Sequence, residues 1–270
     1  MNFKEIEQTL TKEFSKTLRD KTIKAIKEFQ MIEKGDKIAV CISGGKDSIL
    51  LAKLLQNYQK YSGIDFSLIF LAMDGGYSKN VREHIEQNAK VLNIPVEFFE
   101  TDVLRIISNH SAKHPCFLCA KMRRGYLYSE AQKRGCNKIA LGHHYDDAIE
   151  TVLLSIIYGG QIQAMLPKLK SKNYQNMELI RPLYFVREKD VTNWVNTCEL
   201  TFLPCGCPVS EKKDDTKRAE IKKLIASLSA LNPQIEANIL NAVKNVDVDK
   251  VLGWRIGKSE FHSFLDKFNS

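Results

Sequence analysis

Short apolar runs alternate with amphipathic stretches along the first part of the chain. The runs have the length of buried strands, and the stretches between them have the spacing of helices that bury one face. Strands are expected at 37–42, 66–73, 96–100 and 138–142. Helices are expected at 47–58, 78–92, 102–108, 120–134 and 146–157. Because strands that alternate with helices form a parallel sheet covered on both faces, the pattern predicts an α/β fold.

The two ends of the chain follow other patterns. Residues 2–30 have near-helical apolar spacing and predict one charged amphipathic helix. Later, 179–183 is expected to be a last strand and 187–200 a helix, with Lys168, Lys170 and Lys172 in a basic loop. The remainder is charged and predicted to be helical. We therefore expect three regions, namely a helical extension 1–30, a main domain 31–210 and a C-terminal helical region 211–270.

Composition narrows the class of protein. The chain has 270 residues, of which 44% are hydrophobic and 27% charged, as in an ordinary globular protein. No apolar run approaches the roughly 20 residues that cross a bilayer, and the N-terminus lacks the apolar core of a signal peptide. A cytoplasmic protein with no membrane partner is expected. The net charge of +8 favours a polyanionic partner without proving one.

A glycine-containing loop follows the first expected strand. It comprises Ser43, Gly44, Gly45, Lys46, Asp47 and Ser48. Its spacing differs from a Walker A loop, in which Ser or Thr follows the Gly-Lys pair. Two glycines let backbone N–H groups approach an anion, the helix N-terminus favours negative charge, and Lys46 adds a cation. The structural alternative is a tight turn in which Asp47 or Ser48 caps the helix.

Polar residues also follow two other expected strands. Asp146 and Asp147, in the segment GHHYDD that begins at Gly142, are candidate Mg²⁺ ligands at the same sheet edge, and they equally suit a helix cap. His143 and His144 are candidates for contact with phosphate or nucleobase, or for structural hydrogen bonds. Asp74, at the end of the second strand, has two interpretations of equal weight: a ribose or metal contact, or the start of the Gly75-Gly76 turn.

The chain has seven cysteines, and some of them are candidate metal ligands. Cys41, Cys136 and Cys198 lie in expected strands or helices and are predicted to be buried small hydrophobes. Cys116 and Cys119 form a C-x₂-C pair, and Cys205 and Cys207 form a C-x-C pair. The first pair fits half a zinc site, a redox pair or part of an iron–sulfur site. The second pair matches the usual zinc-knuckle spacing poorly.

A basic segment lies next to the first cysteine pair. Residues 113–138 contain seven Lys or Arg against one acid. Such a bias suits RNA phosphates, with Lys121, Arg123 and Arg124 as the candidate contacts. Tyr126 and Tyr128 have two interpretations, as platforms for an exposed base or as core residues.

Several motifs together resemble the PP-loop ATPase family, whose loop has the form SGGxDS and whose tRNA-modifying members carry GHHxDD. Over roughly 20–210, the segments CFLCAKMRRG, AMLPKL, IRPL and REKD are similar to its tRNA 2-thiocytidine synthetase branch. The resemblance implies a Rossmann-like domain of the adenine nucleotide alpha hydrolase type that splits ATP into AMP and pyrophosphate. It implies ATP contacts from the loop, Asp74, Gly142 and His143, with Lys46, Asp47 and Asp147 as catalytic residues.

The same resemblance implies a 4Fe–4S cluster held by three cysteines, with one iron open. Cys116 and Cys119 carry over directly. The third ligand falls in PCGC, which departs from the usual PCxxC of the family, so Cys205 is favoured and Cys207 is the alternative.

The expected function is ATP-dependent thiolation of a tRNA base, with 2-thiocytidine as the favoured product. The C2 oxygen would attack the α-phosphate of ATP, and sulfide would then displace AMP. A cysteine desulfurase or free sulfide would supply sulfur, and a homodimer is one option for the assembly. The alternatives are cluster-dependent desulfuration, lysidine-type ligation and, least favoured, a zinc-ribbon RNA-binding protein. The sequence leaves the modified nucleotide open.

Overall fold

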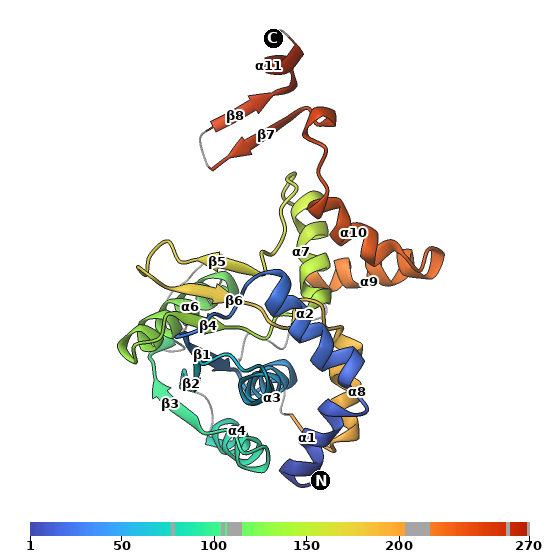
Figure 1. The fold of residues 1–270 in the computed structure, drawn as a ribbon. Helices are drawn as coiled ribbons and strands as arrows, with labels where there is room; N and C mark the ends of the chain where they lie inside the picture. Colours follow the sequence, from blue (N-terminus) through green and yellow to red (C-terminus); the bar gives the residue numbers. More distant parts are fainter. Residues whose placement is uncertain (77–78, 104–105, 107–114, 203–216, 258–259, 269–270) are drawn as a thin grey trace. The chain divides into compact units, whose positions relative to one another are not determined.

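The computed structural model describes the chain except residues 77–78, 104–105, 107–114, 203–216, 258–259 and 269–270 (Figure 1). Of 79, 115–120 and 267 it describes the backbone alone. The expected helix at 102–108 and the cysteines Cys205 and Cys207 therefore fall largely or wholly outside the described residues.

A six-stranded sheet forms the centre of the main unit. Its strand order is β3-β2-β1-β4-β6-β5, and every pairing is parallel except that of the edge strand β5 with β6. The strands are β1 (Lys37–Ile42), β2 (Ser67–Asp74), β3 (Val96–Glu100), β4 (Lys138–Ala140), β5 (Lys168–Lys170) and β6 (Glu178–Ile180). The α/β fold with a mostly parallel sheet is confirmed. It brings the carboxyl ends of β1, β2 and β4 to one edge, where such folds bind ligands.

Helices connect these strands. They are α3 (Lys46–Tyr61), α4 (Lys79–Val91), α6 (Pro115–Lys133) and α7 (Tyr145–Ile157), and α8 (Glu188–Thr197) follows β6. The predicted start of α6, at residue 120, is wrong. The helix begins at Pro115. Proline suits the first position of a helix, where its missing N–H has no partner to lose. The backbone of Cys116 and Cys119 is therefore helical and does not belong to a preceding loop.

The N-terminal segment differs from the single predicted helix. It comprises α1 (Phe3–Thr11), a π-helical turn η1 (Ser15–Arg19) and α2 (Asp20–Glu28). The Phe14 N–H donates to the carbonyl of Thr9 five residues earlier, at 2.8 Å. This wider turn keeps Leu10, Phe14 and Leu18 all buried. Burial of these side chains therefore determines the local geometry.

Two predicted irregular or helical stretches contain strands. Lys168–Lys170 is β5 and not a loop, because Leu169 pairs with Leu179 of β6 between the two lysines. The C-terminal tail contains the antiparallel hairpin of β7 (Gly253–Ile256) and β8 (Glu260–Ser263). In the hairpin, Trp254 stacks on His262 with ring centroids 5.1 Å apart. These cross-strand contacts replace the expected helical pattern.

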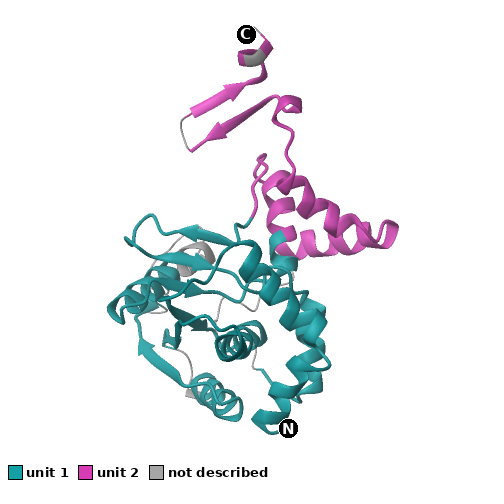
Figure 2. Ribbon diagram, viewed as in Figure 1, with its two compact units in different colours: residues 1–148, 165–216 teal, residues 149–164, 217–270 magenta. Residues whose placement is uncertain are grey.

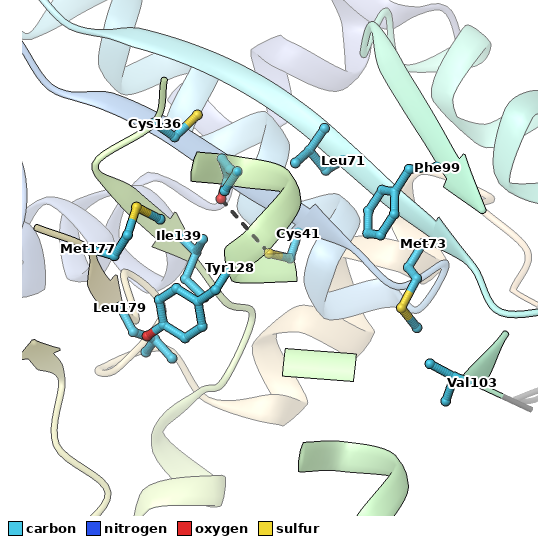
Figure 3. Packing of buried hydrophobic residues seen from close by; sticks show 12 residues of the cluster. Cys41, Leu71, Met73, Phe99, Val103, Tyr128, Cys136, Ile139, Met177 and Leu179 are labelled. Carbon is cyan, nitrogen blue, oxygen red and sulfur yellow. Dashed lines mark hydrogen bonds between the residues drawn. The ribbon is translucent and has the colours of Figure 1, made fainter. Parts of the chain in front are cut away.

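A hydrophobic cluster fills one side of the sheet (Figure 3). Cys41, Leu71 and Ile139 come from neighbouring strands, and Tyr128 of α6 covers them. Each fully buried side chain of this kind contributes about 1.5–3 kcal/mol. The predicted burial of Cys41, Cys136 and Cys198 is confirmed. Burial raises the pKa of the Cys41 thiol to about 12, with a smaller contribution from Cys136.

The chain divides into two compact units (Figure 2). The first, 1–148 with 165–216, contains the sheet. The second, 149–164 with 217–270, contains most of α7, α9 (Lys217–Leu231), α10 (Ile235–Lys244), a 3-10 turn η3 (Val248–Lys250), the hairpin and α11 (Phe264–Phe268). Within the second unit, Arg218 Nε lies 3.3 Å from the buried carboxylate of Glu150. No described helix is long and apolar enough to span a membrane.

Candidate active site

The loop between β1 and α3 is closed by its own serines. The buried Ser48 hydroxyl donates to the Gly45 carbonyl at 2.8 Å and accepts from the Ser43 N–H at 3.1 Å. The Ser43 hydroxyl donates to Ser48 Oγ at 3.2 Å. Gly45 precedes α3 as its cap residue, and among the described residues no side chain makes a capping hydrogen bond to the helix. The first N–H groups of α3 are thus available to an anion, as expected for a phosphate loop.

Two glycines allow the loop to pack closely. Gly44 has φ +81°, and a Cβ there would come within 2.8 Å of the Ile85 side chain of α4. A Cβ on Gly142 would lie 3.0 Å from the carbonyl carbon of Asp47 and 3.1 Å from the Ser48 nitrogen. The structure therefore places the GHHYDD segment directly against the start of α3. Two motifs that are far apart in the sequence form one site.

Lys46 lies between two carboxylates. Its Nζ is 3.2 Å from an Asp47 oxygen and 3.2 Å from Glu188 Oε1 of α8. Partial burial lowers the pKa of Lys46, but the charges and hydrogen bonds of Asp47 and Glu188 outweigh that effect and raise it overall. The ammonium group therefore stays charged near neutral pH. Asp47 Oδ1 is buried and lies 3.2 Å from the Lys46 ammonium, which balances its charge.

His144 and Asp147 form a reciprocal cap at the start of α7. The His144 N–H donates to Asp147 Oδ2 at 3.0 Å, and the Asp147 N–H donates to His144 Nδ1 at 3.4 Å. This is the arrangement of a capping box, with histidine in the place of serine. The other ring nitrogen, Nε2, faces Asp47 Oδ1 at 4.0 Å. The predicted helix-cap role is thus present, and it orients His144 toward the loop.

Asp146 connects α7 to α8. Its Oδ2 accepts the Glu188 N–H at 2.7 Å, and its Oδ1 lies 3.3 Å from Arg187 Nε. Among the described residues, no three His, Cys, Asp or Glu side chains are grouped so that they could hold a metal ion. The assignment of Mg²⁺ to Asp146 and Asp147 therefore stays a prediction.

Asp74 closes the turn that follows β2. Its Oδ1 accepts the Gly76 N–H at 3.1 Å, and its Oδ2 lies 3.3 Å from Arg82 of α4. The turn-forming interpretation is therefore present in the structure. A contact with ribose or metal stays a prediction, and Arg82 is a neighbour that the sequence did not single out.

Arg181 is a site residue that sequence reasoning missed. It is buried, with its Nε 3.4 Å from His143 Nδ1 and a hydrogen bond from Nη1 to the Leu166 carbonyl. Burial lowers its pKa to about 10, and the neighbouring positive charge of Arg124 adds to the effect. The signal was the arginine inside the apolar segment IRPL, which was predicted to be a strand and belongs to the family resemblance, although Arg181 itself was not singled out.

The basic helix α6 presents a mixed surface. Lys121 and Arg124 are exposed and Arg123 is half-buried. Tyr128 is buried and stacks on Tyr174 with centroids 5.1 Å apart, so its interpretation as a core residue is confirmed. Tyr126 is partly buried and packs against the same hydrophobic cluster. Contact of Lys121, Arg123 and Arg124 with RNA stays a prediction.

The predicted cluster ligands are only partly within the described residues. The backbone of Cys116 and Cys119 lies in the first two turns of α6, with the two residues about one helical turn apart. The third position, Cys205 or Cys207, lies outside the described residues.

Comparison with known proteins places these features in context. The PP-loop domain family matches residues 15–226. The chain is 36% identical over 227 residues to the tRNA-cytidine(32) 2-sulfurtransferase of Anaeromyxobacter dehalogenans, covering 83% of this chain and 77% of that protein. It is 37% identical to the enzyme of the same name from Alkalilimnicola ehrlichii, covering 96% and 81%.

A solved structure shares the fold. The U34-tRNA thiolase NcsA of Methanococcus maripaludis, with its 4Fe–4S cluster, superimposes with a TM-score of 0.68. The match covers 84% of this chain and 78% of that one at 23% sequence identity. At this identity the likeness shows a common architecture.

Proposed function

The chain belongs to the PP-loop family, in which its relatives are tRNA-cytidine(32) 2-sulfurtransferases, and from this premise we propose that it is an ATP-dependent tRNA thiolase. The substrate base is a cytidine of tRNA, and sulfur replaces the oxygen at C2. The observation that carries the proposal is the packing of Gly142 against the start of α3, which joins SGGKDS and GHHYDD into one site.

The loop would hold the β- and γ-phosphates of ATP. The N–H groups in the first turn of α3 would donate to phosphate oxygens, with Ser43 beside them in the same loop. Lys46 stays protonated because Asp47 and Glu188 raise its pKa, so it can neutralise charge that develops on the departing pyrophosphate. Gly142, His143 and Asp74 complete the nucleotide contacts in this proposal.

In this proposal the base is activated by adenylation before sulfur is attached. The C2 oxygen attacks the α-phosphorus, the bond to the β-phosphate oxygen breaks, and pyrophosphate leaves. The C2–O–AMP bond then breaks as sulfur attaches to C2, and AMP carries away the original oxygen. Asp47 and Asp147 stand at the start of their helices, and we assign them to positioning the phosphates and the ions that accompany them.

A 4Fe–4S cluster would be held by Cys116, Cys119 and Cys205, with Cys207 as the alternative third ligand. The cysteine thiolates suit iron, and the helical backbone of α6 places the first two about one turn apart. When bound, the cluster would supply an iron site that holds the incoming sulfur. The sulfur originates from a cysteine desulfurase or from free sulfide.

Mg²⁺ would accompany ATP. Proteins usually hold this ion with one or two carboxylates and substrate phosphates, so a dedicated set of three protein ligands is unnecessary. Asp146 and Asp147 are the proposed ligands.

The tRNA would approach over α6. The exposed Lys121 and Arg124, with Arg123, supply phosphate contacts beside the cysteine pair. Sequence-specific proteins bind RNA mostly at single-stranded loops, where unstacked bases are accessible.

Product analysis of the anaerobically purified protein tests the proposal. With tRNA and ATP, the protein should form AMP and pyrophosphate together with thiolated base, and it should contain iron and sulfide. Lys46→Ala should lower the rate at least 100-fold, as loss of a transition-state contact does. The matched control Lys60→Ala, near the other end of the same helix, should keep the parent rate.

The other outcomes separate the alternatives. ADP and phosphate as products would contradict the PP-loop chemistry. Loss of sulfur from thiolated tRNA without ATP would indicate desulfuration, and zinc at one per chain without iron would indicate a zinc ribbon.

A further inference from the structure

A basic pocket lies beside the candidate active site, within the sheet-containing unit. Its volume is about 510 Å³, and η1, α2, the start of α7 and the start of α8 contribute its wall. Among the described residues that line it are four cations and one carboxylate. The cations are Lys21, Lys24, Arg187 and Lys189, and the carboxylate is Asp190. Three of these residues, Arg187, Lys189 and Asp190, belong to the segment REKD, to which the sequence assigned no contact.

The ammonium groups of two of these lysines are available to an anionic ligand. In the described part of the chain, Lys24 and Lys189 form no salt bridge, and both are exposed. The Lys24 ammonium lies over the Phe185 ring at 5.2 Å from the centroid. An aromatic ring orients a cation without neutralising it. The other two cations have carboxylate neighbours, since Lys21 lies 3.9 Å from Asp190 and Arg187 lies 3.3 Å from Asp146.

Two residues connect the segments that line the pocket to the candidate active site. Tyr145, the first residue of α7, lines the pocket, lies under the Arg187 guanidinium at 4.9 Å, and belongs to the GHHYDD segment. Glu188 lies between the pocket residues Arg187 and Lys189 and contacts Lys46 at 3.2 Å. The wall of the pocket is therefore built by the same two helix starts that contact the phosphate loop.

We infer that this pocket binds the phosphate backbone of the substrate RNA, a surface separate from α6. The inference rests on the proposed function, because it assumes that tRNA is the substrate. Phosphate contacts by Lys and Arg dominate nucleic-acid affinity, and cations spread over two elements fit several consecutive phosphates better than one compact anion. The pocket thereby fixes the register of the RNA beside the site of adenylation.

A salt series with paired variants tests the inference. Binding of fluorescent substrate tRNA to the full chain is measured from about 50 to about 200 mM salt. The double variant Lys24→Ala/Lys189→Ala should weaken binding roughly tenfold or more, and should reduce the slope of log K against log salt by about 1.5. Lys27→Ala is the matched control, because Lys27 is an exposed lysine of α2 outside this pocket. It should change neither quantity.

The remaining outcomes decide against the inference. If the double variant binds tRNA with the parent affinity and slope, the pocket is no part of the RNA surface. If it loses affinity for ATP and keeps affinity for tRNA, the pocket serves the phosphates of the free nucleotide. Circular dichroism of each variant shows whether the fold persists, and the single variants replace the double one if it does not.

Failure of the proposed function gives a different result. If the parent protein neither binds nor thiolates tRNA, then tRNA is not its substrate and the proposed function is wrong. If the parent protein thiolates tRNA and the double variant binds tRNA with the parent affinity, the proposed function stands. Only the assignment of this pocket to RNA binding is then wrong.

Discussion

At the scale of single residues, cysteine serves two kinds of purpose in this chain. Cys41 lies in β1 and Cys136 just before β4, and both contact the cluster that contains Leu71 and Ile139. Burial raises their pKa values to about 12 and about 11. A thiol that stays protonated is a poor metal ligand and a poor nucleophile. These cysteines are therefore packing residues, in contrast to the proposed ligands Cys116 and Cys119.

The buried thiols predict a loss of stability at alkaline pH. In the unfolded chain they ionise near 9, whereas Cys41 in the folded chain stays protonated up to about 12. Ionisation therefore stabilises only the unfolded state as the pH rises above 9. The free energy of unfolding should fall by roughly 1–2 kcal/mol per thiol between about pH 8 and about pH 10.5. Urea unfolding at each of these two pH values measures the free energy of unfolding.

Cys41→Ala serves as the comparison for this prediction. The variant should be less stable at about pH 8 because of the cavity, and its stability should depend less steeply on pH than that of the parent protein. Equal pH dependence in the two proteins would show that ionisation of Cys41 does not contribute.

At the scale of elements, α7 and α8 are held together at their first turns. Asp146 of α7 accepts the Glu188 N–H of α8 at 2.7 Å and pairs with Arg187. Glu188 in turn contacts Lys46 at the start of α3. Three helix starts therefore share one hydrogen-bonded network, and the position of Lys46 depends on α8 as well as on its own loop.

Loss of the Asp146 carboxylate should destabilise this arrangement. Asp146→Ala removes the hydrogen bond from the Glu188 N–H and the ion pair with Arg187, which should lower the free energy of unfolding by roughly 1–3 kcal/mol. The midpoint of urea unfolding is the measurement. Asp65→Ala, at an exposed position outside the helices, should leave the midpoint within error. An unchanged midpoint for Asp146→Ala would mean that the network adds no stability.

Elements also show where sequence patterns were sufficient. The strands 37–42 and 96–100 were predicted with the bounds that the structure has, because an apolar run between polar turns is a local signal. The antiparallel strand β5 was missed because Leu169 is its single apolar residue. The π-turn η1 was missed because the burial of Phe14 and Leu18 depends on the rest of the unit.

At the scale of the whole molecule, the proposed cluster joins segments that are distant in the chain. Cys116 and Cys119 lie in α6, between β3 and β4, whereas Cys205 follows α8. A cluster held by three cysteines of two segments links them covalently through iron. The three proposed ligands therefore come together only in the tertiary structure, and no single motif contains all of them.

Alanine variants distinguish the two possible third ligands. Cys205→Ala should lose iron and sulfide together, since a cluster without one of its ligands is labile, and Cys207→Ala should keep both. Iron and sulfide analysis after anaerobic purification measures the loss. Cys198→Ala is the control, because Cys198 is buried near Thr9 and should affect packing alone. Loss in Cys207→Ala and retention in Cys205→Ala would move the assignment by two positions.

The sequence by itself determined the parallel α/β framework and the two motifs of the site. Both are local: periodicity comes from neighbouring residues, and SGGKDS and GHHYDD each follow a strand directly. The tertiary structure alone decided that Glu188, 142 positions after Lys46, contacts it. It also decided that Arg181 is buried beside His143, that Gly142 packs against Asp47, and that four cations surround one pocket. These features depend on which segments the sheet brings together, and hydrophobic burial drives that assembly without regard to the polar side chains it places side by side.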